Sequence, residues 1–350
     1  MKFSAQLAFL TCLCTAWPVL CCAEKPSPAE VAWLSRAELL SANLERPFHN
    51  SMGMAFVPVE IHGGPSDSLA AQESVFFATT VVTVQEYAIF VRETKREWPA
   101  AGFFQTEEHP AVKVTWFDAV AFCEWLTDRE HSLGILPDCA KYRLPTDHEW
   151  SCAVGIGRVE DLDITLPDPA AGLDKPIIFR SVIPEHIQWL CHAPESLRFR
   201  WVGPVTLGRA GGEKEDPAAS PAAKSLAISG YPWGDEWPPP QGSGNYSDDS
   251  LLGLHCGWCS TGRFDGFPFT SPVRSFDPNV FGLYDMGGNV WQWCMDSYEP
   301  GDPAFRVLRG GSWYYAEEFY LRSSYRNFVT PESRFDDIGF RCVVAVGMGD

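Results

Sequence analysis

The chain has 350 residues, of which 45% are hydrophobic, so it is long enough for one large domain or two modest ones. Its formal net charge is -18, with 45 Asp and Glu against 27 Lys and Arg, which excludes the excess of basic side chains that binding a phosphate backbone requires. No nucleic-acid partner is therefore expected. The 14 Trp and 23 Phe residues, with 29 Gly and 28 Pro, favour a loop-rich fold held together by aromatic packing.

The N-terminal segment has the composition of a secretory leader. Lys2 precedes a long uncharged run, and small residues lead up to a cleavage site that we place after Ala23. A retained membrane anchor is the alternative, but Pro18 interrupts the apolar run. We therefore expect a signal peptide at 1–23 and a lead-in segment at 24–50. The protein would be exported, periplasmic or extracellular, with no membrane span after leader cleavage.

Eight cysteines remain after that cleavage. They are Cys123, Cys139, Cys152, Cys191, Cys256, Cys259, Cys294 and Cys342. An even number in an exported chain predicts disulfide bonds, whose pairing the sequence leaves open. His255, Cys256 and Cys259 could instead begin a zinc site, but no second matching pair stands nearby. Disulfides or free structural thiols are the favoured interpretation.

Three segments begin with the pattern T-x-x-E or T-x-x-D. The pairs are Thr83 with Glu86, Thr115 with Asp118, and Thr146 with Glu149. In such a capping box the threonine hydroxyl accepts a backbone N–H at the start of a helix, and the acid accepts one in return. After the second box, apolar residues recur at the spacing of one helix face, at Ala119, Phe122, Cys123 and Leu126. The pattern predicts three helices that belong to the core rather than to a catalytic site.

Residues 157–229 differ in composition from the rest of the chain. Pro-rich and Ala-rich patches surround a more apolar island at 177–194. This pattern predicts an insertion within a domain that covers 51–347. The alternative is a small docking element, since Trp189 and Leu190 would otherwise be exposed.

Three short loops, at 244–249, 264–267 and 284–293, are rich in Asp, Asn and Gly. Calcium takes six to eight oxygen ligands from carboxylates, amides and backbone carbonyls, so loops of this composition suit it. The simpler interpretation is that these residue types form turns. Composition alone favours turns over calcium. No G-x-S-x-G elbow, phosphate loop or H-E-x-x-H motif occurs, so common hydrolase and nucleotide chemistries are unsupported.

The sequence GGSW at 310–313 lies within a group of arginines. These are Arg306, Arg309, Arg322, Arg326, Arg334 and Arg341. In so acidic a chain they could form internal ion pairs and stack on aromatic rings, or they could line a groove for a peptide carboxylate. The structural role is the favoured interpretation.

Nine segments occur along the chain in a fixed order. They are GMAFVPVE (53–60), VTVQEYAIFV (82–91), HPAVKVTWFDAVAFCEWL (109–126), YRLPTDHEW (142–150), YPWGDEW (231–237), SPVRSFDPNVFGLYDMGGNVWQW (271–293), RVLRGGSW (306–313), LRSSYRN (321–327) and IGFRCV (338–343). Together they resemble the formylglycine-generating enzyme family, also called sulfatase-modifying factor domains. The resemblance covers nearly the whole mature chain except the insertion. It implies a single α+β domain with the irregular, loop-rich fold related to C-type lectins.

The resemblance also implies calcium, because members of the family bind two calcium ions through loops that align here. One site would use the side chains of Asn245 and Asp265 with the carbonyls of Tyr246 and Phe267. The second would use the side chains of Asp285 and Gln292 with the carbonyls of Gly288 and Val290. Gln292 stands where the family typically has Glu. We therefore expect one or two calcium ions, with weaker binding at the second site.

The resemblance places two tyrosines at the catalytic positions. In the enzymes that oxidise a sulfatase cysteine to formylglycine, two cysteines after the GGS corner hold copper and activate oxygen. Tyr315 and Tyr320 stand at those positions here, while Ser312 is kept. Tyrosine cannot supply the soft thiolate pair that copper(I) requires, so neither copper nor formylglycine generation by that mechanism is expected.

These features lead us to expect an exported, non-catalytic binding or accessory module. Its groove, with Trp313, Arg322 and Arg326, would hold an extended peptide or glycan, and a sulfatase-like protein is a candidate partner. The alternative is an oxygen-dependent metal oxidase acting on a protein or small-molecule substrate, with Tyr315 or Tyr320 as a ligand or radical site. A third possibility is a structural domain without a ligand.

Overall fold

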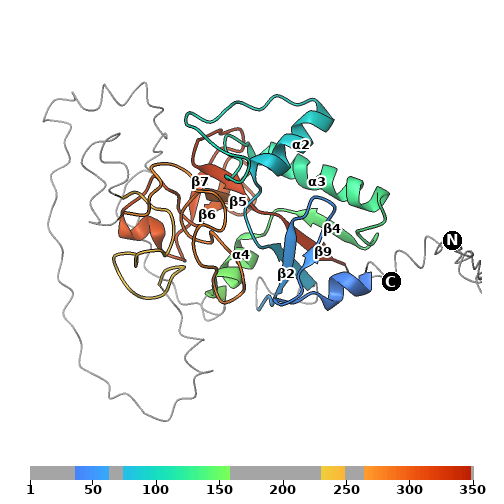
Figure 1. Cartoon of the computed structure of the whole chain (residues 1–350), viewed down its shortest axis with the longest axis horizontal. Helices are drawn as coiled ribbons and strands as arrows, with labels where there is room; N and C mark the ends of the chain where they lie inside the picture. Colours follow the sequence, from blue (N-terminus) through green and yellow to red (C-terminus); the bar gives the residue numbers. More distant parts are fainter. Residues whose placement is uncertain (1–35, 63–73, 158–229, 249–263, 348–350) are drawn as a thin grey trace, which may run out of the picture.

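The computed structural model describes residues 36–62, 74–157, 230–248 and 264–347. The expected leader, the insertion beyond residue 157 and the segment from His255 to Cys259 lie outside these ranges. Within them, short strands form two sheets, and the helices α2, α3 and α4 pack beside them (Figure 1). Long loops connect these elements, as expected of an α+β fold that is irregular and loop-rich.

The first sheet has five antiparallel strands in the order β1-β2-β3-β9-β4. Their bounds are Phe48–His49 (β1), Ala55–Val59 (β2), Ser74–Ala78 (β3), Ala140–Arg143 (β4) and Val343–Val346 (β9). Val343 of β9 pairs with Phe77 of β3 on one side and with Arg143 of β4 on the other. The last strand of the chain therefore lies inside the sheet, between strands formed much earlier in the sequence.

The second sheet has four strands in the order β7-β6-β5-β8. Their bounds are Trp291–Ser297 (β5), Arg306–Arg309 (β6), Asn327–Val329 (β7) and Ile338–Phe340 (β8). β5 and β8 are parallel, and the other two pairs are antiparallel. The chain passes from β8 to β9, and so from the second sheet to the first, across only two residues, Arg341 and Cys342.

All three predicted helices form, and all three predicted capping boxes are confirmed. The helices are Val84–Thr94 (α2), Trp116–Ser132 (α3) and Asp147–Val154 (α4). In each, the threonine side chain accepts the N3 backbone N–H and the N3 acid accepts the threonine N–H. Because the pattern is local, it specifies where a helix begins without any tertiary contact.

The predicted apolar face of α3 faces the core. α3 runs beside β4 (Figure 1), and its Phe122 side chain is fully buried. The Phe122 ring lies 5.9 Å from that of Tyr87 in α2 and 5.3 Å from that of Phe340 in β8. Edge-to-face and offset ring pairs of this kind stabilise beyond the area that they bury. Aromatic packing thus joins the helices to the second sheet.

The five described cysteines, Cys123, Cys139, Cys152, Cys294 and Cys342, are free thiols in this structure. The sulfur atoms of Cys123 in α3 and Cys342 lie 3.5 Å apart, and both side chains are buried. This contact brings together residues far apart in the chain. It identifies one pair that could be oxidised, while the expected disulfides stay a prediction.

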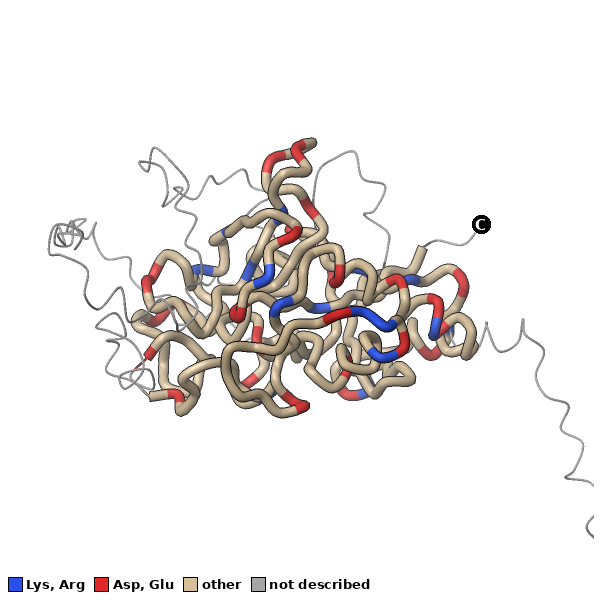
Figure 2. The backbone as a smooth tube through the Cα atoms, turned by 90° about the horizontal axis from the view of Figure 1, so that it is seen from above, with Lys and Arg blue, Asp and Glu red and all other residues tan. Residues whose placement is uncertain are grey.

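Charged residues are distributed along the whole described backbone. Asp and Glu occur on many segments, with Lys and Arg interspersed among them (Figure 2). In the part of the chain that the structure places, no helix combines the length and the apolar composition that crossing a bilayer requires.

Candidate functional site

The candidate site is centred on the corner that follows β6. Gly310 and Gly311 both have positive φ, 98° and 75°, so the chain turns sharply there. A Cβ atom on Gly311 would lie 2.9 Å from the Leu321 side chain, and the Gly310 carbonyl accepts the N–H of Gly288 at 2.8 Å. The two glycines are needed both for their backbone angles and for this close approach. The corner presents Ser312 to the interior, where it is fully buried.

Ser312 is held by a buried carboxylate. Its Oγ atom donates to Oδ2 of Asp337 at 2.9 Å, just before β8. Burial raises the pKa of Asp337 to about 6, although the hydrogen bond from Ser312 opposes the rise. The Asp337 carbonyl also accepts the N–H of Trp291 at 2.8 Å. No sequence motif marks Asp337, because its only local signal is an acid next to an apolar strand.

Tyr315 and Tyr320 are brought into direct contact. Their ring centroids lie 4.5 Å apart, and Tyr320 is in the short 3-10 helix η5, Glu318–Leu321. Trp291 lies 5.5 Å from Tyr315, and Tyr325 lies 5.2 Å from Tyr320. The two positions that resemble the family's cysteine pair are therefore adjacent, and two aromatic rings fill the space.

The electrostatics of this pair do not suit a copper site. Burial raises the pKa of Tyr315 well above its usual range, and Asp337 raises it further. Burial raises the pKa of Tyr320 to about 12. Both side chains are therefore neutral phenols at neutral pH, whereas copper(I) is held by soft, anionic thiolates. The residues present do not fit the copper centre of the family's enzymes.

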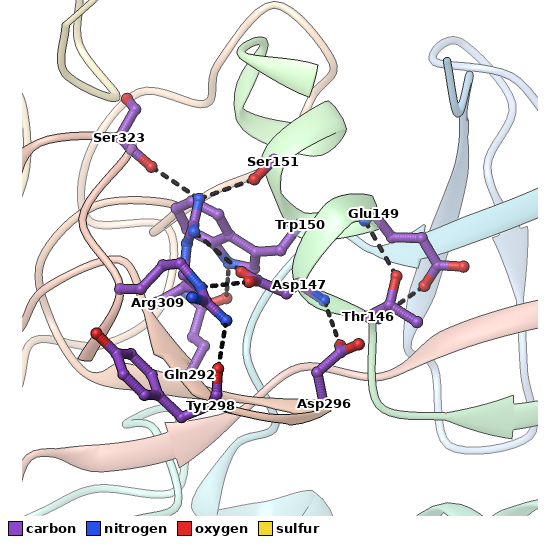
Figure 3. Close-up of polar contacts among 11 residues, drawn as sticks. Thr146, Asp147, Glu149, Trp150, Ser151, Gln292, Asp296, Tyr298, Arg309 and Ser323 are labelled. Atoms are coloured by element: carbon purple, nitrogen blue, oxygen red, sulfur yellow. Dashed lines mark hydrogen bonds and ion pairs between the residues drawn. The ribbon is translucent and has the colours of Figure 1, made fainter. Parts of the chain in front are cut away.

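Arg309, which directly precedes the corner, belongs to a network of charged side chains. Asp147, the first residue of α4, accepts from Arg309 Nη1 at 2.9 Å and from Arg326 Nε at 2.6 Å. Figure 3 shows Arg309 also pointing toward Ser151 and Ser323, to which its Nη2 atom donates at 2.9 Å in both cases. The fully buried Arg309 thus ties three distant segments together.

Arginine stacking also occurs around the corner, as favoured from the sequence. The guanidinium of Arg309 lies 4.7 Å from the Trp150 ring, and that of Arg326 lies 4.8 Å from the Tyr298 ring. Such contacts stabilise a cation through the ring quadrupole, and more strongly where water is excluded. Two of the six arginines in the group are therefore both ion-paired and stacked.

The three expected groove residues differ in exposure. Trp313 is buried, with the rings of Phe103 and Phe269 5.6 Å and 5.2 Å away. The Arg322 side chain is 42% exposed and pairs with Glu318 at 2.6 Å, while the Arg326 side chain is 37% exposed. The two arginines are therefore the members of this set that reach solvent.

The residues of the first expected calcium site lie together. Asn245 is fully buried, and its Nδ2 donates to the Phe269 carbonyl at 2.7 Å, which orients Oδ1 the other way. That Oδ1 atom has no hydrogen-bond partner among the described residues. Asp265 accepts the backbone N–H of Tyr246 at 3.0 Å and that of Phe267 at 2.8 Å. A buried amide oxygen without a partner, in the residue before the one whose N–H binds the Asp265 carboxylate, fits a hard cation.

The residues of the second expected site also lie together, but the side-chain oxygen of Gln292 is occupied. Gln292 Oε1 accepts from Trp150 Nε1 at 3.3 Å and from Arg341 Nε at 3.1 Å. Gln292 Nε2 donates to the Asp285 carbonyl at 2.8 Å. These contacts leave the Gln292 side chain without an oxygen lone pair for calcium, because an amide oxygen has two. The site does not fit the ligand set expected from the sequence.

The Asp285 carboxylate completes this second cluster. It accepts the Arg274 N–H at 3.2 Å and Asn289 Nδ2 at 3.3 Å. Burial raises the pKa of Asp285, against which Arg341 and Arg274 act through their charge. Burial lowers the pKa of Arg341 to about 10, so this side chain stays charged at neutral pH. Over the described ranges, no group of three His, Cys, Asp or Glu side chains is arranged to hold a metal.

Comparison with known proteins shows matches over most of the chain. Residues 53–163 and 213–346 match the family described as "Sulfatase-modifying factor enzyme 1-like domain". The chain is 36% identical over 256 residues to the "Inactive C-alpha-formylglycine-generating enzyme 2" of Bos taurus, covering 71% of this chain and 54% of the relative. It is 26% identical over 268 residues to the "Formylglycine-generating enzyme" of Thermomonospora curvata, covering 70% of this chain and 59% of that protein. The chain thus spans little more than half the length of these relatives.

Solved structures also align with this one. The structure of PvdO from Pseudomonas aeruginosa aligns with a TM-score of 0.44 and 20% identity, covering 83% of this chain and 93% of that chain. The crystal structure of CarF aligns with a TM-score of 0.46 and 19% identity, covering 83% of this chain and 97% of that chain.

Proposed function

Because this chain belongs to the sulfatase-modifying factor enzyme 1-like family, we propose that it is an exported, non-catalytic binding module whose partner is a sulfatase-like protein. The observation that carries the proposal is the direct contact between Tyr315 and Tyr320, 4.5 Å between ring centroids. The family resemblance assigns these two positions to the cysteine pair. The surrounding scaffold is kept while the reactive groups are replaced. A site of this kind retains shape without the thiol chemistry.

The chemistry of formylglycine formation explains why the replacement matters. Oxidising a cysteine with oxygen needs a centre that takes up electrons and binds oxygen, which the family builds on two thiolates. Two neutral phenols, of which Tyr315 is buried and Tyr320 partly buried, offer no such ligand pair. Ser312 remains, but its Oγ proton is directed to Asp337. The corner would then serve as a binding surface for a ligand.

Recognition is proposed to occur beside this corner, through its two solvent-reaching arginines. Arg322 and Arg326 follow η5, and their side chains are 42% and 37% exposed. Arginine presents a planar fork that matches carboxylate and sulfate groups. An extended peptide or an anionic glycan of the partner fits this chemistry. Export follows from the leader expected at 1–23.

Calcium is proposed to bind at the first of the two expected sites. The oxygens of Asn245 and Asp265, with the carbonyls of Tyr246 and Phe267, would surround the ion. The unpartnered Oδ1 atom of buried Asn245 supports this assignment. A bound calcium would neutralise the Asp265 carboxylate and hold the loop that carries it against the corner.

The test combines binding with turnover on the mature protein. The probe is a synthetic peptide that spans the modified cysteine of a sulfatase, with its cysteine either kept or replaced by serine. We expect both peptides to bind, and no oxygen uptake with copper or iron and a reductant. Oxygen uptake with modification of the cysteine peptide would overturn the proposal and favour the metal-oxidase alternative.

Substitutions locate the binding surface. Arg322→Ala combined with Arg326→Ala should weaken peptide binding at least tenfold. Arg129→Ala is the matched control, because Arg129 lies on α3 and is similarly exposed and ion-paired, at 2.8 Å from Glu93. If the wild-type protein, the double variant and Arg129→Ala bind the peptide with equal affinity, recognition occurs elsewhere and the corner has no role in it.

A further inference from the structure

Arg341 lies in the short connection between the two sheets. It is one of the two residues that connect β8 with β9, so its backbone belongs to neither sheet. Its side chain is fully buried and donates from all three of its nitrogen atoms. Nη1 donates to the Ala78 carbonyl at the end of β3 at 2.7 Å, Nη2 to the Tyr284 carbonyl, and Nε to Gln292 of β5. One guanidinium therefore joins both sheets and the 284–292 loop.

We propose that Arg341 is the resident cation at the second expected calcium position, and that no metal ion binds there. The positive charge at this position then comes from the Arg341 side chain, which is part of the chain, instead of from an exchangeable metal ion. The family's calcium loop would keep its backbone path while losing its dependence on the metal. The single calcium site that remains rests on the function proposed above.

The orientation of the Gln292 amide excludes its oxygen as a calcium ligand. Two N–H donors, from Trp150 and Arg341, converge on one end of the amide, and the Asp285 carbonyl faces the other end. The end that meets the donors must be the oxygen and the end that meets the carbonyl must be the NH₂. Turning the amide over would place donor against donor and acceptor against acceptor. The group that faces the loop is thus a hydrogen-bond donor, which cannot ligate calcium.

The charges already present at the second expected calcium position also disfavour a metal ion. The Asp285 carboxylate is the one acidic side chain of the expected ligand set, and the guanidinium groups of Arg341 and Arg274 already act on it. A glutamate at position 292 would have added a second negative charge. With glutamine there, a calcium ion would bring two more positive charges into a buried site that already holds a cation, where charges interact strongly. The buried environment therefore disfavours the metal.

Calcium binding to three matched variants of the full mature chain tests the proposal. Equilibrium dialysis and calorimetry with calcium alone give the number of ions and their affinity. Asp265→Asn should lower calcium affinity at least tenfold. Asp285→Asn should change it less than twofold, and asparagine tolerates the positive φ of 54° at this position. Asp277→Asn, at an exposed aspartate of the same loop region, is the control.

The outcomes separate this inference from the proposed function. One ion on the wild-type protein that is lost in Asp265→Asn and kept in Asp285→Asn supports both. Two ions on the wild type, one of them lost in Asp285→Asn, would overturn the role of Arg341. If the wild-type protein binds no calcium, the calcium part of the proposed function fails, while the absence of metal at Gln292 is upheld.

Discussion

Replacing Asp147 with asparagine should strongly destabilise the fold, because Asp147 is the charge partner of a fully buried arginine. The Arg309 side chain has no solvent exposure, and the Asp147 side chain is 18% exposed. Asparagine keeps the size of the side chain and one acceptor oxygen, but it removes the negative charge between Arg309 and Arg326. The guanidinium of Arg309 would then be buried with only neutral partners, at Ser151 and Ser323.

The expected magnitude follows from these exposures. Removing one partner of a buried ion pair costs about 3–5 kcal/mol, since the remaining charge stays out of water. The second pair adds little, because the Arg326 side chain is 37% exposed and such pairs contribute about 0–1 kcal/mol. Loss of a negative charge in the first turn of α4 adds about 0.3–1 kcal/mol. The free energy of unfolding of Asp147→Asn should therefore fall by about 3–7 kcal/mol.

Urea unfolding followed by tryptophan fluorescence measures this change directly. The matched control is Glu93→Gln, which breaks an ion pair of similar geometry whose side chains are 30% and 39% exposed. It should lower the free energy of unfolding by no more than about 1 kcal/mol. A loss below about 1 kcal/mol for Asp147→Asn would refute the reasoning, since it would mean that Arg309 does not depend on this carboxylate.

Three further changes test other parts of the structure. The pKa of Asp337 is raised from 3.8 to about 6, so the folded protein holds this proton more tightly and stability falls by about 3 kcal/mol as pH rises from about 4 to 6. In urea unfolding, Asp337→Asn should flatten that fall, and an unchanged pH profile would contradict it. Oxidative refolding should join Cys123 to Cys342, whose sulfurs lie 3.5 Å apart; peptide mapping that finds both thiols still alkylated would contradict this. Gly288→Ala should prevent stable folding. The φ of Gly288 is 76°, and an added Cβ would clash with the backbone carbonyl of Asn245. Gly301→Ala, with φ 82° and nothing within 4 Å, should lose only about 1–3 kcal/mol in thermal unfolding, and equal losses would exclude the clash.

Some features of this protein were determined by the sequence alone. The three helix starts could be predicted because a capping box involves residues only three positions apart. The α+β, loop-rich fold followed from nine segments in family order. The sequence also shows tyrosine at 315 and 320, the two positions that the resemblance assigns to the family's cysteine pair.

Only the tertiary structure decided how the site is charged and held. Asp147 and Arg309 are 162 positions apart, and Arg341 meets Gln292 across 49 positions. The family resemblance implied a calcium site at 284–293, where Asp285, Gln292 and two backbone carbonyls are suitable oxygen ligands in isolation. In the structure, the buried Arg341 side chain, from the connection between the two sheets, donates to the Gln292 oxygen that calcium would need. Local patterns act through the backbone of neighbouring residues, whereas the partner of a buried charge is chosen by the packing of distant segments.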